Sequence, residues 1–297
     1  MDIRYPKKRG KNNMKTLNIK IAGLFVTTAL LLAGIAQADL PFNNLQGVGG
    51  AAFNPLAYPS GNAWNTDKTS TDEIFKPENI FSKPQFGAWY VNLGDVDVNW
   101  TAFGVSETLF KRLELSYGHE VISPAYGPSI NKDNLGAKLL LIKENEWDSP
   151  FVPAVSVGAI LKKTSDTGAG VDDTGSDFYL VATKLITQTP KPVVISGGVL
   201  STDARATGVF GYDDDRDVTL FGNVDVVLHP KVAIGAEYKQ GADFGSYKDA
   251  DYWDAHVVFF PNNNLSIIAA YVNAGDEKST SKVGLGDGFV LSAQYKF

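Results

Sequence analysis

The pair of side chains best suited to acid–base chemistry is Asp254 and His256, two residues apart in a segment that alternates apolar and polar residues. Both side chains would share one face of an extended strand. A carboxylate beside an imidazole can orient it as a general base, and a hydrolase would then need a serine nucleophile on the same face. Ser266 and Ser292 lie on neighbouring segments, but the face of Ser266 is ambiguous. We favour a hydrogen-bonded or ionic network over catalysis and predict no catalytic residue.

Metal and cofactor chemistry have weaker support. The chain contains no cysteine, and neither His119 nor His229 lies at ligand spacing from His256. The glycine-rich segment 47–58 lacks the preceding strand, the following helix and the Lys-Ser/Thr pair that a phosphate-binding loop requires. We therefore predict no metal site and no cofactor.

The elements that position these residues are strands, and the clearest is the last one, residues 288–297. Apolar residues occupy every second position from Phe289 to Phe297, with Gln294 and Lys296 among the residues between them. A period of two predicts a strand with one apolar and one mostly polar face. A terminal phenylalanine after such alternation resembles the closing strand of bacterial outer-membrane β-barrels. In that setting, the strand ending at Phe297 would also contact the barrel-assembly machinery.

Segments of similar alternation recur from residue 83 to the end of the chain, and helical periodicity is absent. After the first hairpin, the connections between them alternate between short and long. Short turns are expected at 106–112, 143–150, 187–192, 229–231 and 261–264, and long loops at 123–134, 162–176, 201–217, 241–251 and 273–287. Transmembrane barrels have short periplasmic turns and long outer loops. We predict an all-β fold, a transmembrane up-and-down antiparallel β-barrel of about 12 strands, with roughly 10 to 14 possible, over residues 83–297.

Residues 1–38 are typical of a signal peptide. A basic stretch begins at Met14, an apolar run follows at 21–35, and Ala36-Gln37-Ala38 is a small-residue cleavage site. Cleavage near Ala38 would leave Asp39 as the first mature residue. The residues before Met14 would be an upstream extension, and the start codon is either Met1 or Met14. The predicted location is the outer membrane of a Gram-negative bacterium.

The mature chain is acidic. Removing the 7 basic and 1 acidic residues of the leader from totals of 27 and 33 leaves 20 basic and 32 acidic residues, a net charge of −12. This balance excludes nucleic acid as a partner, since its binding needs a basic surface. The expected partners are outer-membrane lipid and lipopolysaccharide. Acidic loop residues such as Asp213, Asp214 and Asp215 could bind divalent cations among the headgroups, but a solvated loop surface is the simpler interpretation.

Residues 39–82 form a Gly/Pro-rich N-terminal segment ahead of the barrel. Two interpretations remain open at this point. The segment is either periplasmic or folded into the barrel lumen as a plug.

The strand pattern assigns polar residues to the lumen and aromatic residues to the lipid face. The lumen or pore-lining candidates are Asp97, Asn99, Arg112, Glu114, Lys138, Asn223, Asp225, Glu237, Lys239, Asp254, His256, Gln294 and Lys296. The candidates for a lipid-facing aromatic girdle are Trp100, Tyr117, Phe259, Tyr271, Tyr295 and Phe297.

The segment Asp251–Gly275 resembles a proteobacterial family of secreted, uncharacterised proteins that are regarded as outer-membrane β-barrels and grouped by a domain of unknown function. Residues 47–58, Leu180–Lys184 and Ala204–Thr207 resemble the same family. The resemblance covers most of the mature chain. It implies the barrel and the location, and no activity or functional residue.

These observations favour a monomeric, non-enzymatic outer-membrane barrel that is either a narrow or plugged channel for a small solute or an envelope scaffold. A strand number near 12 falls between filled barrels of about 8 strands and open porins of about 16, so size alone does not decide. The alternatives are an outer-membrane hydrolase that uses Asp254 and His256, and a soluble secreted β-sandwich.

A channel would lead ions past Arg112, Glu114, Glu237 and Lys239, because lumen charges tune selectivity. In a conducting barrel, replacing both Glu237 and Lys239 by Ala is expected to shift ion selectivity in planar-bilayer recordings. Unchanged selectivity would contradict this assignment.

Overall fold

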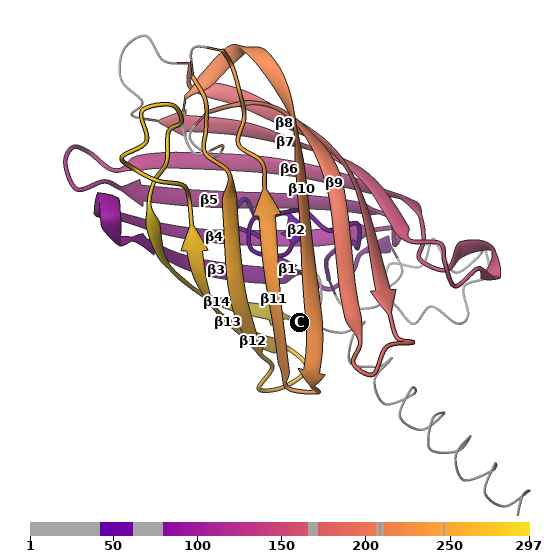
Figure 1. Ribbon diagram of the computed structural model, residues 1–297. Coiled ribbons are helices and arrows are strands. Elements are labelled where there is room, and N and C mark those ends of the chain that lie inside the picture. Colours follow the sequence, from indigo (N-terminus) through magenta and orange to yellow (C-terminus); the bar gives the residue numbers. More distant parts are fainter. Residues whose placement is uncertain (1–41, 62–79, 166–171, 206–207, 209–210, 246) are drawn as a thin grey trace, which may run out of the picture.

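The computed structural model describes residues 42–61, 80–165, 172–205, 208, 211–245 and 247–297 (Figure 1). The expected signal peptide, its cleavage site and residues 62–79 of the N-terminal segment lie outside these ranges. Within the described part, no helix is long and apolar enough to cross a membrane.

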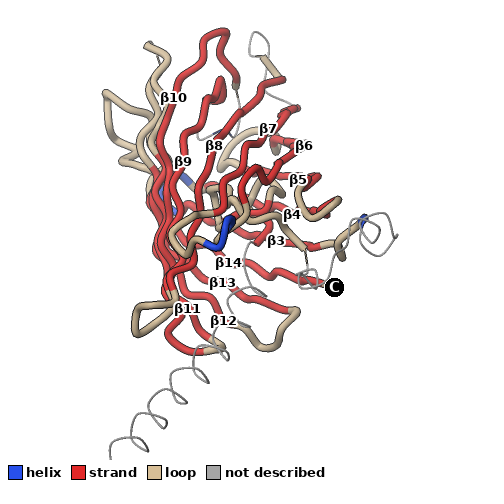
Figure 2. The backbone as a smooth tube through the Cα atoms, turned by 90° about the vertical axis from the view of Figure 1, so that its right-hand side faces the viewer, coloured by secondary structure: helices blue, strands red, loops and turns tan. Residues whose placement is uncertain are grey.

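Twelve antiparallel strands close into one barrel, in the order β10-β11-β12-β13-β14-β3-β4-β5-β6-β7-β8-β9 (Figures 1 and 2). They are β3 (Gln85–Leu93), β4 (Val98–Leu109), β5 (Leu113–Ser123), β6 (Ile130–Ile142), β7 (Ala154–Ser165), β8 (Thr174–Ile186), β9 (Val193–Ala204), β10 (Tyr212–His229), β11 (Val232–Lys239), β12 (Tyr252–Phe259), β13 (Leu265–Asn273) and β14 (Asp287–Lys296). Each strand pairs with the next in the chain. The predicted up-and-down barrel of about 12 strands is confirmed.

The C-terminal strand closes the barrel by pairing with the first barrel strand. β14 and β3 are antiparallel, with Leu291 opposite Tyr90 and Lys296 opposite Gln85. The alternative of a β-sandwich is wrong, because one sheet closes on itself instead of two sheets packing face to face.

Several strands extend beyond the ends that the sequence pattern predicts. The expected turn at 106–112 is mostly strand, since β4 runs to Leu109 and only 110–112 turn the chain. β6 begins at Ile130 and β10 at Tyr212, inside segments expected to be loops. Backbone pairing needs no apolar side chains, so polar residues continue these strands past the apolar part of the wall.

The connections divide between two ends of the barrel, which we call the terminal rim and the loop rim. The terminal rim holds the start of β3 and the end of β14. The loop rim, at the opposite end, carries the connections β3–β4, which includes η3 (Gly94–Val96), β5–β6, β7–β8, β9–β10, β11–β12 and β13–β14. Its two longest are 240–251 and 274–286. On the terminal rim, β6–β7 contains η4 (Glu146–Asp148), and β10–β11 is only 230–231.

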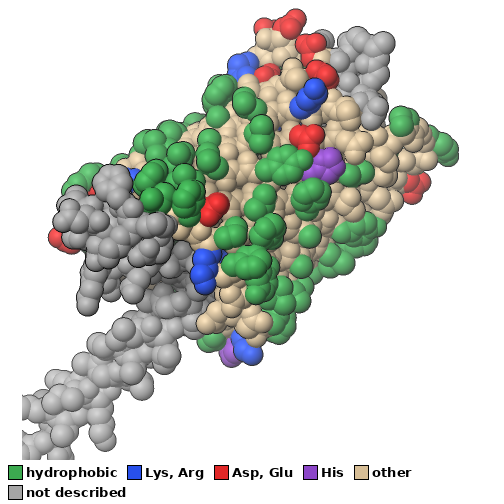
Figure 3. Space-filling model, turned by 180° about the vertical axis from the view of Figure 1, so that it is seen from behind, with side chains coloured by type: hydrophobic (Ala, Val, Ile, Leu, Met, Phe, Trp, Pro, Cys, Tyr) green, Lys and Arg blue, Asp and Glu red, His purple; other side chains and the backbone are tan. Residues whose placement is uncertain are grey.

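The outer face of the wall is apolar, and hydrophobic side chains cover much of the face seen in Figure 3. Along β14, the exposed Phe289, Leu291 and Tyr295 alternate with the buried Ser292 and Gln294. A large exposed apolar surface is unusual for a soluble protein and typical of a wall that contacts lipid.

Placing a charge on this outer face should destabilise the barrel in a bilayer. Leu291 lies near the midpoint of β14 and is 48% exposed. We expect Leu291→Arg to lower the free energy of unfolding in phospholipid vesicles by about 2–4 kcal/mol, measured by urea titration. Ser279→Arg, in the β13–β14 connection, is the matched control and should have little effect. Equal stability of both variants would show that this face does not meet lipid.

Candidate functional site

The barrel lumen is occupied by residues 42–61, which we call the plug. Its two short strands, β1 (Phe42–Asn43) and β2 (Gly49–Gly50), pair with each other and lie inside the wall in Figure 1. The side chains of Phe42, Leu45 and Leu56 are at most 2% exposed. Of the two interpretations of the N-terminal segment, the lumen position is the one seen for these residues. The expected boundaries at 39 and 82 stay predictions.

The apolar side of the plug packs against apolar residues on the inner wall. Phe42 and Leu45 form one buried cluster with Trp89, Val91 and Trp100, residues of β3 and β4. Trp100 is only 8% exposed, so its assignment to the lipid-facing girdle is wrong. The physical reason is that the inner wall is itself apolar where the plug packs on it, so polarity did not reveal which face of β4 points inward.

A tight turn seats the plug on wall glycines. Gly47 has a φ of +83°, a left-handed conformation that favours glycine. A Cβ on Gly104 would lie 2.6 Å from the Gly47 Cα, and a Cβ on Gly118 would lie 2.4 Å from the Gln46 carbonyl oxygen. Glycine at these wall positions lets the plug backbone approach this closely.

A buried ion pair on β5 and β6 binds the plug backbone. Glu114 and Lys138 are both 1% exposed, with 2.9 Å between Oε2 and Nζ. Glu114 accepts hydrogen bonds from the backbone N–H groups of Gly49 at 2.8 Å and Ser60 at 2.7 Å. Lys138 donates to the carbonyls of Gly49 and Tyr58 at 2.6 and 2.8 Å. Both charges are therefore satisfied by each other and by plug peptide groups.

The opposite wall holds the plug in the same way. Glu237 on β11 is 3% exposed and accepts hydrogen bonds from three consecutive backbone N–H groups, those of Ala52, Phe53 and Asn54, the last at 2.9 Å. β11 lies six strands from β5 in the closed order, directly across the barrel.

A second pair of opposite strands completes this arrangement. Gln294 on β14 accepts from the backbone N–H of Asn43 at 3.1 Å, and Thr183 on β8 accepts from that of Ala57 at 2.8 Å. β14 and β8 are also six strands apart. The plug is thus held from four sides by wall side chains.

Tyr58 also contacts the terminal rim, where its hydroxyl donates to Glu144 in the β6–β7 connection at 2.9 Å. Burial and the Glu144 carboxylate raise the pKa of Tyr58 well above its usual value, which keeps the hydroxyl protonated as a donor.

Asp254 and His256 are close together, as their spacing predicts, but they form a carboxylate network. His256 Nδ1 lies 2.7 Å from Asp254 Oδ1, and Nε2 lies 2.9 Å from Asp225 Oδ1. Both ring nitrogens therefore contact carboxylates, and among the described residues no serine hydroxyl contacts the ring. The side chain is buried, with 6% exposure. This geometry gives the hydrolase alternative no support.

One possible ligand atom from each of Glu237, Asp254 and His256 lies within 4.8 Å of the others. However, both oxygens of Glu237 bind plug N–H groups, and both nitrogens of His256 bind carboxylates. An ion at this point would have to displace those bonds.

Ten of the thirteen predicted lumen residues lie on the inner face. They are Glu114, Lys138, Asn223, Asp225, Glu237, Lys239, Asp254, His256, Gln294 and Lys296. All are buried except Lys239, which is half-buried. Whether they line a path for solute stays a prediction.

The other three do not face the lumen. Asp97 is exposed in the β3–β4 turn with a φ of +51°. Asn99 is exposed on the outer face, where it accepts a hydrogen bond from the Tyr90 hydroxyl at 2.6 Å. Its assignment to the lumen is wrong for the same reason as that of Trp100, because the side chains of β4 point to the faces opposite to those that the polarity pattern predicts. Arg112 lies in the β4–β5 turn and donates to the Leu140 carbonyl at the terminal rim.

Sequence reasoning missed a group of buried charges near the loop rim. Lys132 lies 3.1 Å from Glu120, and Lys162 lies 2.5 Å from Asp177, with all four side chains at most 2% exposed. Lys132 and Lys162 fall in segments that were expected to be loops. Continuing the period of two back from Lys138 to Lys132 on β6, and on from Ser156 to Lys162 on β7, would have placed both lysines on the inner face.

The remaining aromatic girdle candidates lie on the outer face. Phe259, Tyr271, Tyr295 and Phe297 are 43–49% exposed, and Tyr117 is half-buried with its hydroxyl bound to Asp133. Their contact with lipid stays a prediction.

The plugged barrel with its buried lumen charges can be compared with known proteins. The chain belongs to a family described as protein of unknown function (DUF3034), which matches residues 42–294. This match confirms the predicted membership of a family without an established function. No curated protein matches the chain.

Among solved structures, the chain is similar to the NanC porin, at 10% identity over 72% of this chain and 100% of that one, with a TM-score of 0.51. It is also similar to the KdgM porin in complex with disordered oligogalacturonate (14% identity, 72% and 99% covered, TM-score 0.49). A third is an outer-membrane channel from Pseudomonas putida F1 (14% identity, 74% and 98% covered, TM-score 0.45). At such identities, similarity shows the fold alone.

Removing the Glu237 carboxylate should loosen the plug. In Glu237→Ala, the N–H groups of Ala52, Phe53 and Asn54 lose their acceptor, and each buried unsatisfied donor costs about 1–3 kcal/mol. We expect faster hydrogen exchange at these three amides while the barrel amides stay protected, measured by mass spectrometry on the refolded protein. Glu277→Ala, in the β13–β14 connection, is the control. Unchanged exchange at residues 52–54 would contradict the anchoring role.

Proposed function

We propose that this protein is an outer-membrane β-barrel of a Gram-negative bacterium that works as a plugged channel for a small polar solute, without catalysis. The observation that carries the proposal is the plug of residues 42–61, held inside the barrel by Glu114, Lys138 and Glu237. The membrane setting is supported by the apolar outer face and by the signal peptide expected at residues 1–38.

The plug favours a channel over a scaffold because of the size of the barrel. An eight-stranded barrel is just narrow enough to be filled by its own side chains, and wider barrels enclose a space. Here twelve strands enclose a space that a separate segment fills. Displacing that segment would leave a lumen that carries Glu114, Lys138 and Glu237 beside the apolar residues of β3 and β4, and the charged part of this surface suits water and a hydrophilic solute. A barrel that serves only as an envelope scaffold would not need a separate segment that can leave the lumen.

Conductance in planar bilayers tests this proposal. The mature protein, residues 39–297, is expected to be mostly closed, and a variant that lacks residues 39–79 is expected to conduct steadily. Steady conductance of the full mature chain would mean that the plug leaves an open path. Silence of both proteins, in a truncated barrel shown by circular dichroism to be folded, would overturn the channel and favour a scaffold.

A reversible lock tests whether the plug itself is the barrier. A Cβ at Gly136 would lie 2.9 Å from Val48 Cγ2, so Val48→Cys with Gly136→Cys places two thiols within reach of a disulfide. Ser116→Ala is added to make room, since that Cβ would lie 2.2 Å from Ser116 Oγ, which has no hydrogen-bond partner in the described structure. The chain has no other cysteine.

The oxidised variant should stay closed at voltages that open the reduced variant. The variant with only Val48→Cys and Ser116→Ala is the control and should not respond to reductant. Equal opening of the oxidised and reduced forms would place the conducting path elsewhere.

A further inference from the structure

Four ionisable side chains meet on the inner face of three neighbouring strands, and we call Asp225, Glu237, Asp254 and His256 the acidic cluster. In the sheet register, Glu237 on β11 lies directly opposite Asp254 on β12, and Gly235 lies opposite His256. Gly235 also lies opposite Asp225 on β10, so His256 reaches across the glycine to that carboxylate. A Cβ at Gly235 would lie 2.4 Å from His256 Nε2, so a side chain there would block this contact.

The acidic cluster carries more negative than positive charge. It contains three carboxylates and one imidazole, and all four side chains are at most 6% exposed. Within the described residues, no lysine or arginine forms an ion pair with any of these carboxylates. A protonated His256 therefore balances only one of them. Buried charges are costly unless they are paired, so a bound cation would stabilise the cluster.

Two acceptor oxygens at the cluster have no hydrogen-bond partner within the described residues. They are Oδ2 of Asp254 and Oδ1 of Asn223, whose side chains are 0% and 6% exposed. Asn223 on β10 lies directly opposite Glu237, and its amide Nδ2 donates to Asp225 Oδ2 at 2.9 Å. Buried polar groups are normally hydrogen-bonded. Because both unpartnered atoms are acceptors, a cation is the ligand that suits them.

The possible ligand atoms for a metal ion are already close together. One atom from each of Glu237, Asp254 and His256 lies within 4.8 Å of the others. This span is close to that of ligands held about 2.0–2.2 Å from a single zinc ion. Two carboxylates and an imidazole are ligands that suit Zn²⁺ and similar divalent ions, and three protein ligands leave a fourth position for water.

Asp225 supplies the contact that a metal-binding histidine needs. A ligating imidazole usually donates its other ring N–H to a carboxylate, which fixes the tautomer and the orientation of the ring. His256 Nε2 lies 2.9 Å from Asp225 Oδ1, and Asn223 holds the other oxygen of that carboxylate. Nδ1, which lies 2.7 Å from Asp254 Oδ1, is then the nitrogen that can bind a metal after losing its proton.

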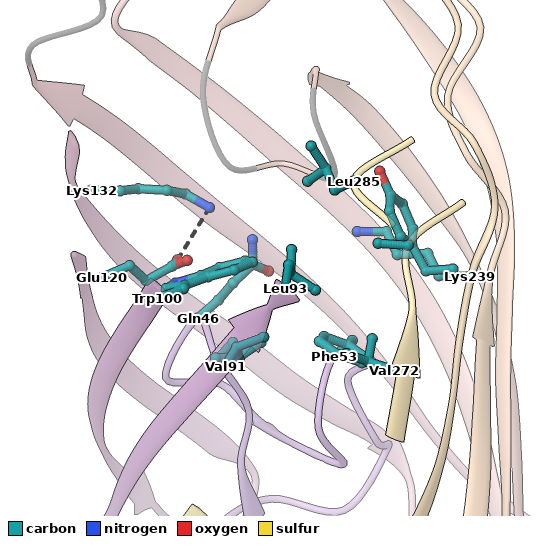
Figure 4. Close-up of a pocket in the computed structure, with 13 residues that line it drawn as sticks. Gln46, Phe53, Val91, Leu93, Trp100, Glu120, Lys132, Lys239, Val272 and Leu285 are labelled. Carbon is teal, nitrogen blue, oxygen red and sulfur yellow. Dashed lines mark ion pairs between the residues drawn. The ribbon is translucent and has the colours of Figure 1, made fainter. Parts of the chain in front are cut away.

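A small cavity near the loop rim ends beside the acidic cluster (Figure 4). Its volume of about 50 Å³ has room for water or a small ion. Phe53 of the plug lines this cavity and donates its backbone N–H to Glu237, and Val272 lines it directly opposite Asp254. The cavity therefore brings a space for a hydrated ion to the edge of the cluster. The charged side chains in its lining are Glu120, Lys132 and Lys239.

We propose that the acidic cluster binds a divalent transition-metal ion of the zinc class, with Glu237, Asp254 and His256 as ligands and Asp225 as a positioning residue. The ion replaces bonds that these ligands make in the plugged structure. Because Glu237 holds the N–H groups of residues 52–54, ion binding loosens this side of the plug. A role in opening rests on the proposed plugged channel, whereas the metal site itself does not.

Isothermal titration calorimetry with Zn²⁺ tests the site, using the refolded mature protein in detergent without a histidine tag. The chain has no cysteine, so thiols do not compete for the ion. We expect Zn²⁺ to bind, and Mg²⁺ to bind at least about tenfold more weakly, because Mg²⁺ prefers octahedral sites made of oxygen ligands. The proposal is overturned if Zn²⁺ does not bind to the folded protein, or if Mg²⁺ binds as tightly.

Conservative variants identify the ligands, with circular dichroism to show that each barrel is folded. We expect Asp225→Asn to weaken Zn²⁺ binding about 10–100-fold, and His256→Gln and Asp254→Asn to weaken it at least as much. His119→Gln is the matched control, because His119 also contacts a carboxylate, that of Asp133 at 2.8 Å, but lies on β5 outside the cluster. Wild-type affinity of His256→Gln, or an equal loss in His119→Gln, would contradict the assignment.

Hydrogen exchange tests the link between the ion and the plug. Saturating Zn²⁺ should speed exchange at the amides of residues 52–54, while the amide of Gly49, which Glu114 holds across the barrel, stays protected. Asp254→Asn should not respond to the same Zn²⁺ concentration. Unchanged exchange at residues 52–54 with the ion bound would overturn the link. Neither binding nor exchange requires conduction, so a barrel that stays silent in bilayers would overturn the channel and not the metal site.

Discussion

The structure depends on pairing the peptide groups of the plug with polar and charged side chains on the inside of the closed barrel wall. A segment folded into a barrel lumen carries backbone N–H and C=O groups away from bulk water, and each needs a partner. The wall supplies carboxylates, an amide and a hydroxyl as acceptors for the N–H groups of Asn43, Gly49, Ala52 and Ala57, from strands that face each other across the barrel. The same contacts also serve the wall, because without the plug the Glu237 carboxylate would lose its three backbone N–H partners, and Glu114 and Lys138 would keep only each other.

The fold was predictable because its signals are local and repeated. Alternation along β14 and the ending at Phe297 are set by a wall with two different environments, and each strand repeats the pattern. The Asp254–His256 contact was predictable for the same reason, since residues two apart share a face. Their third partner, Asp225 on β10, was not, because the sequence gives no register between β10 and β12, which are separated by β11.

The wrong side-chain assignments occur where the inner face of the wall is apolar, whereas the simple barrel pattern assumes that it is polar. Inward-facing residues were expected to be polar, but the inner wall near β3 and β4 is apolar because the plug covers it with Phe42 and Leu45. The polarity pattern therefore predicts the wrong face for both Trp100 and Asn99. A shift of one residue moves every side chain of a strand to the opposite face, so the two errors occur together. A plug packed into the lumen is a long-range contact, and no local pattern of β4 reports it.

The apolar and polar contacts of the plug have different consequences for its release. When the plug leaves, both its peptide groups and the wall charges regain water, so each hydrogen bond lost costs only about 0.5–1.5 kcal/mol net. Each fully buried apolar side chain that becomes exposed, such as Phe42 or Leu56, costs about 1.5–3 kcal/mol. Per contact, a buried apolar side chain therefore contributes more to the affinity than a hydrogen bond, and the directional hydrogen bonds fix the register in which the plug sits.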